Sequence, residues 1–345
     1  MIELKKKSNY NINNCGHSSV VERLVANEKV EGSTPFARSK KIVIKSKYIT
    51  SVFQRYLDNR DIRSFKNSFV YYLLFRVFRN FLVSDIIIQI YNFKIFGSIK
   101  RKKTSYFLLK KCNFGDYYEL DLIKKMSNLN KILLVDCGCN YGFYSFFAAK
   151  LSKKNIVISI EASKDTSKDF LRNLKLNDNK NIYFENKAIS NLDNINISFN
   201  EGENDWESSQ AHRSFKIKKV ENIQTITIDT LLKPYDLNNY KLIIKLDIEG
   251  NEMNAIQGAL RAVKNYSPIF IIEFSKYIFD HQHNIEYLNN FLKEFNYSIY
   301  DLNKKKMTVK KIIIKLNQLK KRFKTIGNYY LINNSSENLN FFLNE

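Results

Sequence analysis

Two short apolar segments, about a hundred residues apart, each run directly into a polar turn. Residues 132–135 are followed by Asp136-Cys-Gly-Cys-Asn-Tyr-Gly142, and residues 242–244 are followed by Lys245-Leu-Asp-Ile-Glu-Gly-Asn-Glu252. Open α/β sheets hold nucleotide-like ligands where a buried strand stops at a glycine-rich turn and a helix begins. The two segments together therefore predict one ligand site at the carboxyl ends of parallel strands.

The first turn indicates which ligand the site accepts. A dinucleotide loop of the form G-x-G-x-x-G offers helix N-terminal N–H groups to a pyrophosphate. Here Asp136 stands at the strand end and no phosphate-binding lysine follows. A carboxylate there repels phosphate and suits a ligand with a cationic ammonium or sulfonium, which describes S-adenosylmethionine. Glu161, about twenty residues after Gly138, has the spacing of a carboxylate that accepts hydrogen bonds from ribose hydroxyls.

Strand-like and helical segments alternate after residue 130. The apolar periodicity predicts strands at 132–137, 156–161, 182–189, 242–247 and 269–274, with a further strand-like approach at 225–232. It predicts helices at 142–152, 165–176, 252–264 and 285–295, and an antiparallel pair, 298–302 with 329–332, that closes the sheet. This alternation is typical of a doubly wound, mostly parallel α/β sheet.

Composition divides the chain into three parts. Residues 129–345 form the predicted Rossmann-like domain. Residues 40–128 are basic and aromatic, with helical character from Tyr48 into the nineties and strand-like material at 94–114, so we expect a mainly helical N-terminal extension. Residues 1–39 differ in character from everything that follows them.

The segment 15–39 resembles a translated transfer-RNA gene. With one permitted codon chosen for each residue, GCGGGCA near its start pairs with TGCCCGC near its end, TTGCCAA forms an anticodon loop and GGTTCGACTCC contains a T-loop. A glycine-accepting tRNA with anticodon GCC fits this string. The hypothesis implies that the native start lies downstream and that residues 1–39 are a non-native leader.

The net charge of +22 raises nucleic acid or an anionic membrane as partners. Lysine is accompanied by abundant Asn, Ile, Tyr and Phe, the residues of A/T-rich codons, so a drift in base composition explains scattered lysines as a solvated surface. The denser runs at 100–103, 304–306 and 320–324 are candidates for contact with phosphates or lipid head groups.

No charge-free apolar stretch approaches the length of a membrane span. The best candidate, residues 68–96, contains Arg76, Arg79 and Asp85, which favours a packed or surface-lying helix. The four cysteines, two of them in Cys137-x-Cys139, make no disulfide framework and indicate a reducing cytoplasm. That pair lacks a second ligand pair at zinc-finger spacing, so we expect no metal there. We expect a cytoplasmic protein, peripheral to the inner face of the membrane.

The two turns resemble the motifs of the FkbM-type methyltransferases, a branch of the Rossmann-like, S-adenosylmethionine-dependent class I fold. Asp136-Cys-Gly-Cys-Asn-Tyr-Gly-Phe-Tyr-Ser145 is similar to D-x-G-x-N-x-G-x-x-S. Lys245-Leu-Asp-Ile-Glu-Gly-Asn-Glu252 with Gly258-Ala259 is similar to K-x-D-x-E-G-x-E…G-A, with Thr227-Ile-Asp-Thr-Leu231 before it and Ile271-Ile-Glu-Phe274 after it. The resemblance covers residues 117–274 and implies an O-methyltransferase acting on a hydroxyl of a sugar, glycan or glycolipid.

By position, the resemblance also implies roles for single residues. Those placed around the methionine moiety are Asp136, Gly138, Asn140 and Gly142, with Ser145 closing the motif. Glu161 would hold the ribose and Ala188 would lie at the adenine edge. Asp247 and Glu249 would face the transferring methyl group, and Asp247 is also counted among the cofactor-binding residues.

A sugar hydroxyl is a poor nucleophile at pH 7, so methyl transfer to it calls for a general base. Asp247 and Glu249 are the first candidates. Alternatively, Asp247 holds only the cofactor's ammonium and Glu249 stabilises the next helix electrostatically. His281, with His283 beside it, is a second source of a base or of a metal site, unless both face solvent. The polar insertion that contains Trp206, Ser208, Ser209 and His212 is a candidate lining for the acceptor pocket.

Two other functions remain open from the sequence. An RNA methyltransferase would use the basic N-terminal region as an RNA platform, although the turn after residues 242–247 lacks the Asn/Asp-Pro-Pro-aromatic run common in amino-group methylators of bases. An inactive Rossmann module would bind a membrane or protein partner through residues 68–96. The presence of Asp136, Glu161 and Asp247 together argues against decay of the site.

Overall fold

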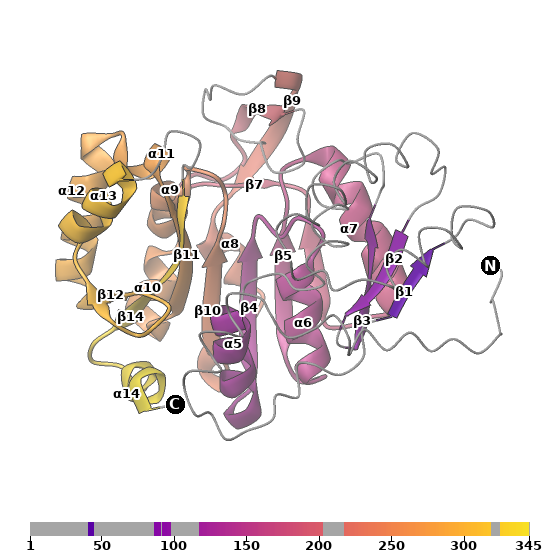
Figure 1. The fold of residues 1–345 in the computed structure, drawn as a ribbon, viewed down its shortest axis with the longest axis horizontal. Coiled ribbons are helices and arrows are strands. Elements are labelled where there is room, and N and C mark those ends of the chain that lie inside the picture. Colours follow the sequence, from indigo (N-terminus) through magenta and orange to yellow (C-terminus); the bar gives the residue numbers. More distant parts are fainter. Residues whose placement is uncertain are drawn as a thin grey trace, which may run out of the picture. The chain divides into compact units, whose positions relative to one another are not determined.

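The computed structural model describes residues 41–44, 86–90, 92–97, 117–202, 217–318 and 325–344 (Figure 1). The chain forms two compact units, Met1–Gly115 and Asp116–Glu345. Several predicted features lie outside the described residues. They are the tRNA-like segment, the lysine runs at 100–103 and 320–324, and the candidate pocket residues Trp206, Ser208, Ser209 and His212. No helix in the described ranges is long and apolar enough to cross a membrane.

Three strands of the first unit form an antiparallel sheet in the order β1-β2-β3. They are β1 (Lys41–Ile44), β2 (Ile86–Ile90) and β3 (Phe93–Gly97). The expectation of helical character into the nineties is therefore wrong for residues 86–90. Three consecutive isoleucines begin β2, β-branched residues favour extended backbone, and the backbone of β2 pairs with both β1 and β3. The rest of the expected helical region, residues 48–85, lies outside the described ranges.

The second unit is built on an eight-stranded sheet in the order β13-β12-β14-β11-β10-β4-β5-β6. Its strands are β4 (Ile132–Cys137), β5 (Ile156–Ile160), β6 (Ile182–Glu185), β10 (Lys241–Leu246), β11 (Ile269–Ser275), β12 (Tyr297–Tyr300), β13 (Lys306–Met307) and β14 (Thr325–Asn333). The five strands from β6 to β11 are parallel, and β14, β12 and β13 continue the sheet in antiparallel fashion. The predicted mostly parallel α/β sheet is confirmed.

Helices cover both faces of this sheet, which is why its central strands are apolar throughout. Every residue of β4 is buried. In Figure 1, α5 (Tyr117–Leu129) and α6 (Phe143–Leu151) lie on the viewer's side of the sheet, and α8 (Ile228–Leu232) lies behind it. The other helices of this unit are α7 (Lys164–Asn177), α9 (Glu252–Gln257), α10 (Leu260–Tyr266), α11 (Lys276–Phe279), α12 (Gln282–Glu294), α13 (Val309–Gln318) and α14 (Glu337–Asn344), with the 3-10 helix η3 (Leu237–Asn239).

A small separate sheet in the order β7-β9-β8 changes the bounds of two predicted strands. Its strands are β7 (Ala188–Ile189), β8 (Asn196–Gly202) and β9 (Ile217–Ile226). The predicted strand 182–189 is divided, because β6 pairs with β5 whereas β7 pairs with β9. The predicted strand-like segment 225–232 stops at Ile226, where the Thr227 hydroxyl accepts a hydrogen bond from the Thr230 N–H and begins α8.

The predicted helix 252–264 is interrupted at Gly258-Ala259, which separates α9 from α10. A side chain at position 258 would collide with the carbonyl oxygen of Ser190. The helix therefore breaks at the one residue without a Cβ, where the backbone that follows β7 approaches it.

We expect Asn155→Ala to lower the free energy of unfolding by about 2–4 kcal/mol, because several buried groups lose their partner. The Asn155 side chain is 1% exposed, donates to Ala148 O at 2.9 Å and Ser127 Oγ at 2.8 Å, and accepts from Ile132 N at 3.3 Å. Urea denaturation of the full chain measures the change. Asn290→Ala, on an exposed position of α12, is the control and should stay within about 0.5 kcal/mol of wild type. Equal effects of the two substitutions would show that the hydrogen bonds of the Asn155 side chain do not stabilise the fold.

Candidate active site

The carboxyl ends of β4, β5, β10 and β11 lie side by side and bring the two predicted motifs together. Asp136 pairs in register with Lys245 across β4 and β10. Just beyond this pair, the Asp247 N–H donates to the Cys137 carbonyl at 3.2 Å. Two motifs that are distant in sequence are thus joined backbone to backbone.

The first loop turns on three residues in the left-handed region, Gly138 at φ 75°, Asn140 at φ 51° and Gly142 at φ 86°. The N–H groups of Gly138 and Cys139 both donate to the Ile160 carbonyl at 2.9 Å, which fixes the loop to the end of β5. A Cβ at position 138 would collide with the carbonyl oxygen of Asp247. Glycine is required at this position by the close approach of the second loop as well as by its own backbone angle.

Glu161, at the end of β5, connects this loop to α7. Its Oε2 accepts from Asn140 N at 3.0 Å, and its Oε1 accepts from Ser163 N at 2.9 Å. Asn140 Oδ1 is buried and accepts no hydrogen bond within the described structure. Glu161 therefore orders the predicted cofactor loop, and its contact with a ribose stays a prediction.

Asp136 is 1% exposed, and its Oδ2 accepts from the Ser145 hydroxyl at 2.6 Å. The Ser145 oxygen in turn accepts from Ser159 Oγ at 2.8 Å. Burial raises the pKa of Asp136, while the charge of Lys245 and the Ser145 hydrogen bond oppose that rise. Ser145 is fully buried, so the structure places it behind Asp136 as a support of that carboxylate.

Lys245 lies within the candidate site but was omitted from the predicted site residues, although it opens the second motif. Its side chain is buried, and Nζ donates to Asp247 Oδ2 at 2.9 Å. The same Nζ lies 4.6 Å from the centroid of the Tyr144 ring, within the range of a cation–π contact. The signals in the sequence were its place at the start of the second motif and the apolar residues on both sides of it, Ile244 and Leu246.

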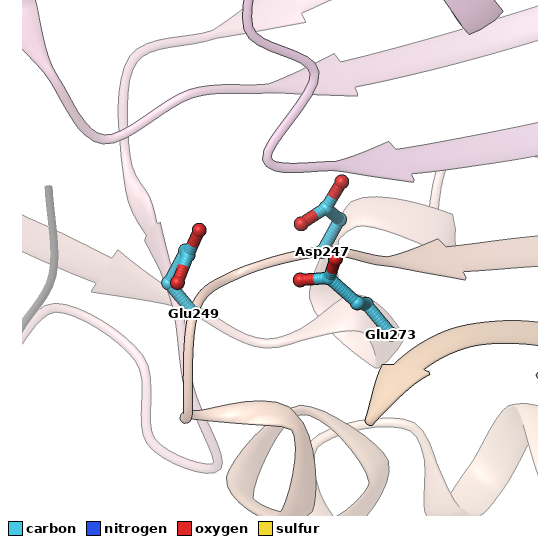
Figure 2. A group of neighbouring side chains, drawn as sticks. All are labelled: Asp247, Glu249 and Glu273. Atoms are coloured by element: carbon cyan, nitrogen blue, oxygen red, sulfur yellow. The ribbon is translucent and has the colours of Figure 1, made fainter. Parts of the chain in front are cut away.

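Three carboxylates gather where β10 and β11 end (Figure 2). One carboxylate oxygen from each of Asp247, Glu249 and Glu273 lies within 4.8 Å of those from the other two. Burial raises the pKa of Glu273 well above its ordinary range, and the charges of Asp247 and Glu249 raise it further, whereas Lys245 opposes them. The group alone does not define a metal site, because partly exposed carboxylates often lie this close without an ion. Glu273 was quoted in a motif but not predicted as a site residue.

Glu252 shapes the loop that carries two of these carboxylates. It is 1% exposed, and its carboxylate accepts from Gly250 N at 2.9 Å and from Ile248 N at 3.3 Å. Burial raises the pKa of Glu252 to about 7, and its backbone hydrogen bonds oppose the rise. Glu249 adopts the left-handed region at φ 61°, a strained conformation for a residue with a side chain.

Other predicted residues lie apart from this group. Ala188 is buried in β7, and its place at an adenine edge stays a prediction. His281 and His283 are exposed with their rings 5.5 Å apart, and neither belongs to the carboxylate group. Cys137 and Cys139 are buried free cysteines, and burial, together with the charge of Asp136, raises the pKa of both thiols well above the ordinary range.

A parallel sheet with a carboxylate-bearing glycine turn after β4 and an acidic turn after β10 is the arrangement of a Rossmann-like methyltransferase. Residues 136–299 match the family model of the methyltransferase FkbM domain. The resemblance predicted from the two motifs is confirmed by this match. The enzyme class, a methyltransferase, follows from the same match.

Several solved structures are similar to this chain. Methyltransferase FkbM from Methylobacillus flagellatus KT is 19% identical, with 66% of this chain and 52% of that chain covered and a TM-score of 0.36, so the match spans about half the length of that relative. Precorrin-6y C5,15-methyltransferase from Geobacter metallireducens GS-15 is 12% identical, with 65% and 90% covered and a TM-score of 0.34. TYW2 from M. jannaschii, solved in complex with AdoMet, is 12% identical, with 72% and 83% covered and a TM-score of 0.35. No curated protein matched the sequence.

Gly138→Ala should destabilise the fold far more than Gly327→Ala. Both glycines have positive φ, 75° and 94°, so both substitutions carry the backbone cost of about 1 kcal/mol. Only at position 138 would the new methyl group collide with backbone, whereas nothing lies within 4 Å at position 327. We expect an additional loss of about 2 kcal/mol or more in urea denaturation for Gly138→Ala. Equal losses would show that the two loops do not meet as described.

Proposed function

We propose that this protein is an S-adenosylmethionine-dependent O-methyltransferase that acts on a hydroxyl group of a sugar, glycan or glycolipid. The observation that carries the proposal is the meeting of the two motif loops, with Asp136 and Asp247 at the ends of neighbouring strands, inside a methyltransferase FkbM domain. The methyl donor is S-adenosylmethionine, which supplies an electrophilic methyl group on a sulfonium.

The residues of the first loop fit this cofactor. Asp136 Oδ1 and Asn140 Oδ1 are buried acceptors that receive no hydrogen bond within the described structure. Buried acceptors of this kind are rare in folded proteins and call for a donor. A cationic amino-acid moiety supplies such donors, and the carboxylates nearby favour its positive charge. A phosphate would meet only repulsion from the same groups.

The chain's own residues position the reaction. Methyl transfer requires the acceptor oxygen in line with the methyl carbon and its leaving sulfur, with water excluded. The hydrogen bonds from the first loop to Ile160 and Glu161 hold that loop rigid against β5. Lys245 fixes the Asp247 carboxylate at the end of β10. Asp247 and the neighbouring carboxylates then face the position of the acceptor hydroxyl.

The charge of the site favours a neutral acceptor over RNA. Asp247, Glu249 and Glu273 place three carboxylates together and Lys245 offsets one of them. Nucleic-acid sites neutralise backbone phosphates with Lys and Arg, so a net negative site repels RNA. The basic surface, including exposed Lys305 and Lys306, would hold the cytoplasmic enzyme against anionic lipid, where lipid-linked sugars are found.

Incubation of the full chain with methyl-labelled S-adenosylmethionine and separate RNA and glycolipid fractions tests this function. We expect label in the glycolipid fraction, reduced by about a hundredfold or more in Asp247→Asn because Lys245 loses its charged partner, and unchanged in Asp280→Asn, an exposed control. Label in RNA that disappears in Asp247→Asn would contradict the proposal.

Glu161→Ala should weaken the binding of S-adenosylhomocysteine by about 1–3 kcal/mol, because the first loop loses its anchor and the ribose loses a charged acceptor. Calorimetric titration measures the dissociation constant. Glu185→Ala, at the exposed end of neighbouring β6, serves as the control and should bind as wild type does. An unchanged constant in Glu161→Ala would remove Glu161 from the cofactor site.

A further inference from the structure

We propose that Glu273, at the carboxyl end of β11, is the general base of the methyl transfer, and that Asp247 stays ion-paired with Lys245. This inference rests on the proposed function and names the residue that takes the acceptor's proton. It replaces the predicted bases Asp247, Glu249 and His281 with a carboxylate to which the motif resemblance assigned no role.

The position of Glu273 in the sheet places its carboxylate beside Asp247, where we expect the acceptor hydroxyl. β11 lies beside β10 in parallel, so the ends of the two strands open on the same edge of the sheet. Figure 2 shows Asp247, Glu249 and Glu273 grouped where β10 and β11 end, and one carboxylate oxygen from each lies within 4.8 Å of those from the other two. An acceptor hydroxyl that reaches Asp247 is therefore within reach of Glu273 as well.

Asp247 already forms an ion pair with Lys245. Lys245 Nζ, on a buried side chain, donates to Asp247 Oδ2 at 2.9 Å. Protonation of Asp247 would leave the ammonium facing a neutral acid and would sacrifice a charge-assisted hydrogen bond. Asp247 is better suited to hold its negative charge throughout the reaction than to accept a proton.

Glu273 has the opposite surroundings. No described residue donates a hydrogen bond to its carboxylate, and the β14 residue paired with it in register is the neutral Asn328. The charged groups that act on it are Asp247, Glu249 and Glu252, all acidic, with Lys245 as the opposing cation. Burial, the largest influence, raises the pKa of Glu273 together with these acids. A base serves best when its pKa lies near the working pH, and burial with like charges is the usual way to bring a carboxyl group there.

The step balances without another reactant. As the acceptor oxygen bonds to the methyl carbon, the carbon–sulfur bond breaks and its electron pair passes to sulfur, which becomes a neutral thioether. The hydroxyl proton passes to a Glu273 carboxylate oxygen. Glu273 afterwards releases that proton to solvent and returns to its charged form.

The first test needs no acceptor. Carboxyl NMR of the full chain labelled with ¹³Cδ-glutamate, titrated in the presence of S-adenosylhomocysteine, should contain a resonance that titrates well above the ordinary glutamate range and is absent in Glu273→Gln. Glu252→Gln and Glu119→Gln identify the resonances of two further glutamates in the described structure whose pKa burial raises. Titration of Glu273 in the ordinary range would overturn the proposal.

The second test uses single-turnover methyl transfer to the glycolipid fraction between pH 5 and 9. The wild-type rate should rise with pH as Glu273 loses its proton, and Glu273→Gln should fall by about 10²–10⁴-fold and lose that rise. Its affinity for S-adenosylhomocysteine should stay within about threefold of wild type, and Glu185→Gln should leave the rate unchanged. A rate in Glu273→Gln within threefold of wild type at every pH would overturn the proposal.

Two further outcomes distinguish a failure of this inference from a failure of the proposed function. Wild-type protein that neither binds S-adenosylhomocysteine nor transfers label would refute the proposed function itself. Activity that EDTA abolishes and Mg²⁺ restores, with Glu273→Gln requiring more Mg²⁺, would make Glu273 a cation ligand and overturn its assignment as the base.

Discussion

The buried ammonium of Lys245 is the cation that opposes the negative charge of the carboxylates gathered at the carboxyl ends of the central strands. It stands beside Asp136 in the register of β4 and β10 and donates directly to Asp247. Its charge also opposes the rise in pKa that burial imposes on Asp136, Glu119 and Glu273. Removing one partner of a buried ion pair leaves an uncompensated charge and typically costs about 3–5 kcal/mol. The charge balance at this edge of the sheet therefore depends on one buried side chain.

Around this charge, backbone contacts set the shape of the site. The loop after β4 meets the loop after β10 at Gly138, where a side chain would collide with the Asp247 carbonyl. Glu161 and Glu252 also fix the shape of their own loops, because the carboxylate of each accepts hydrogen bonds from backbone N–H groups. Both loops are held before any ligand arrives, which lowers the entropy that binding must overcome.

Carboxyl groups that are chemically alike take different roles because their surroundings differ. Asp247 faces an ammonium, Glu252 faces backbone donors, and Glu273 faces mainly other acids. Only the last environment raises proton affinity without a compensating hydrogen bond from the described structure. The same comparison explains why Ser145, fully buried against Asp136, supports the site from behind.

The sequence determined the parallel sheet, the two loops and the methyltransferase family, because apolar periodicity and motif spacing are local properties of the chain. It also placed Asp136, Glu161 and Asp247 at strand ends, where the structure finds them. It could not separate β7 from β6, break the helix at Gly258, or extend residues 86–90, since each depends on a neighbouring segment that local pattern does not contain. Only the tertiary structure paired Lys245 with Asp247 and brought Glu273 to them, because contacts across strands follow from sheet order and register, and burial then decides which carboxyl group binds a proton.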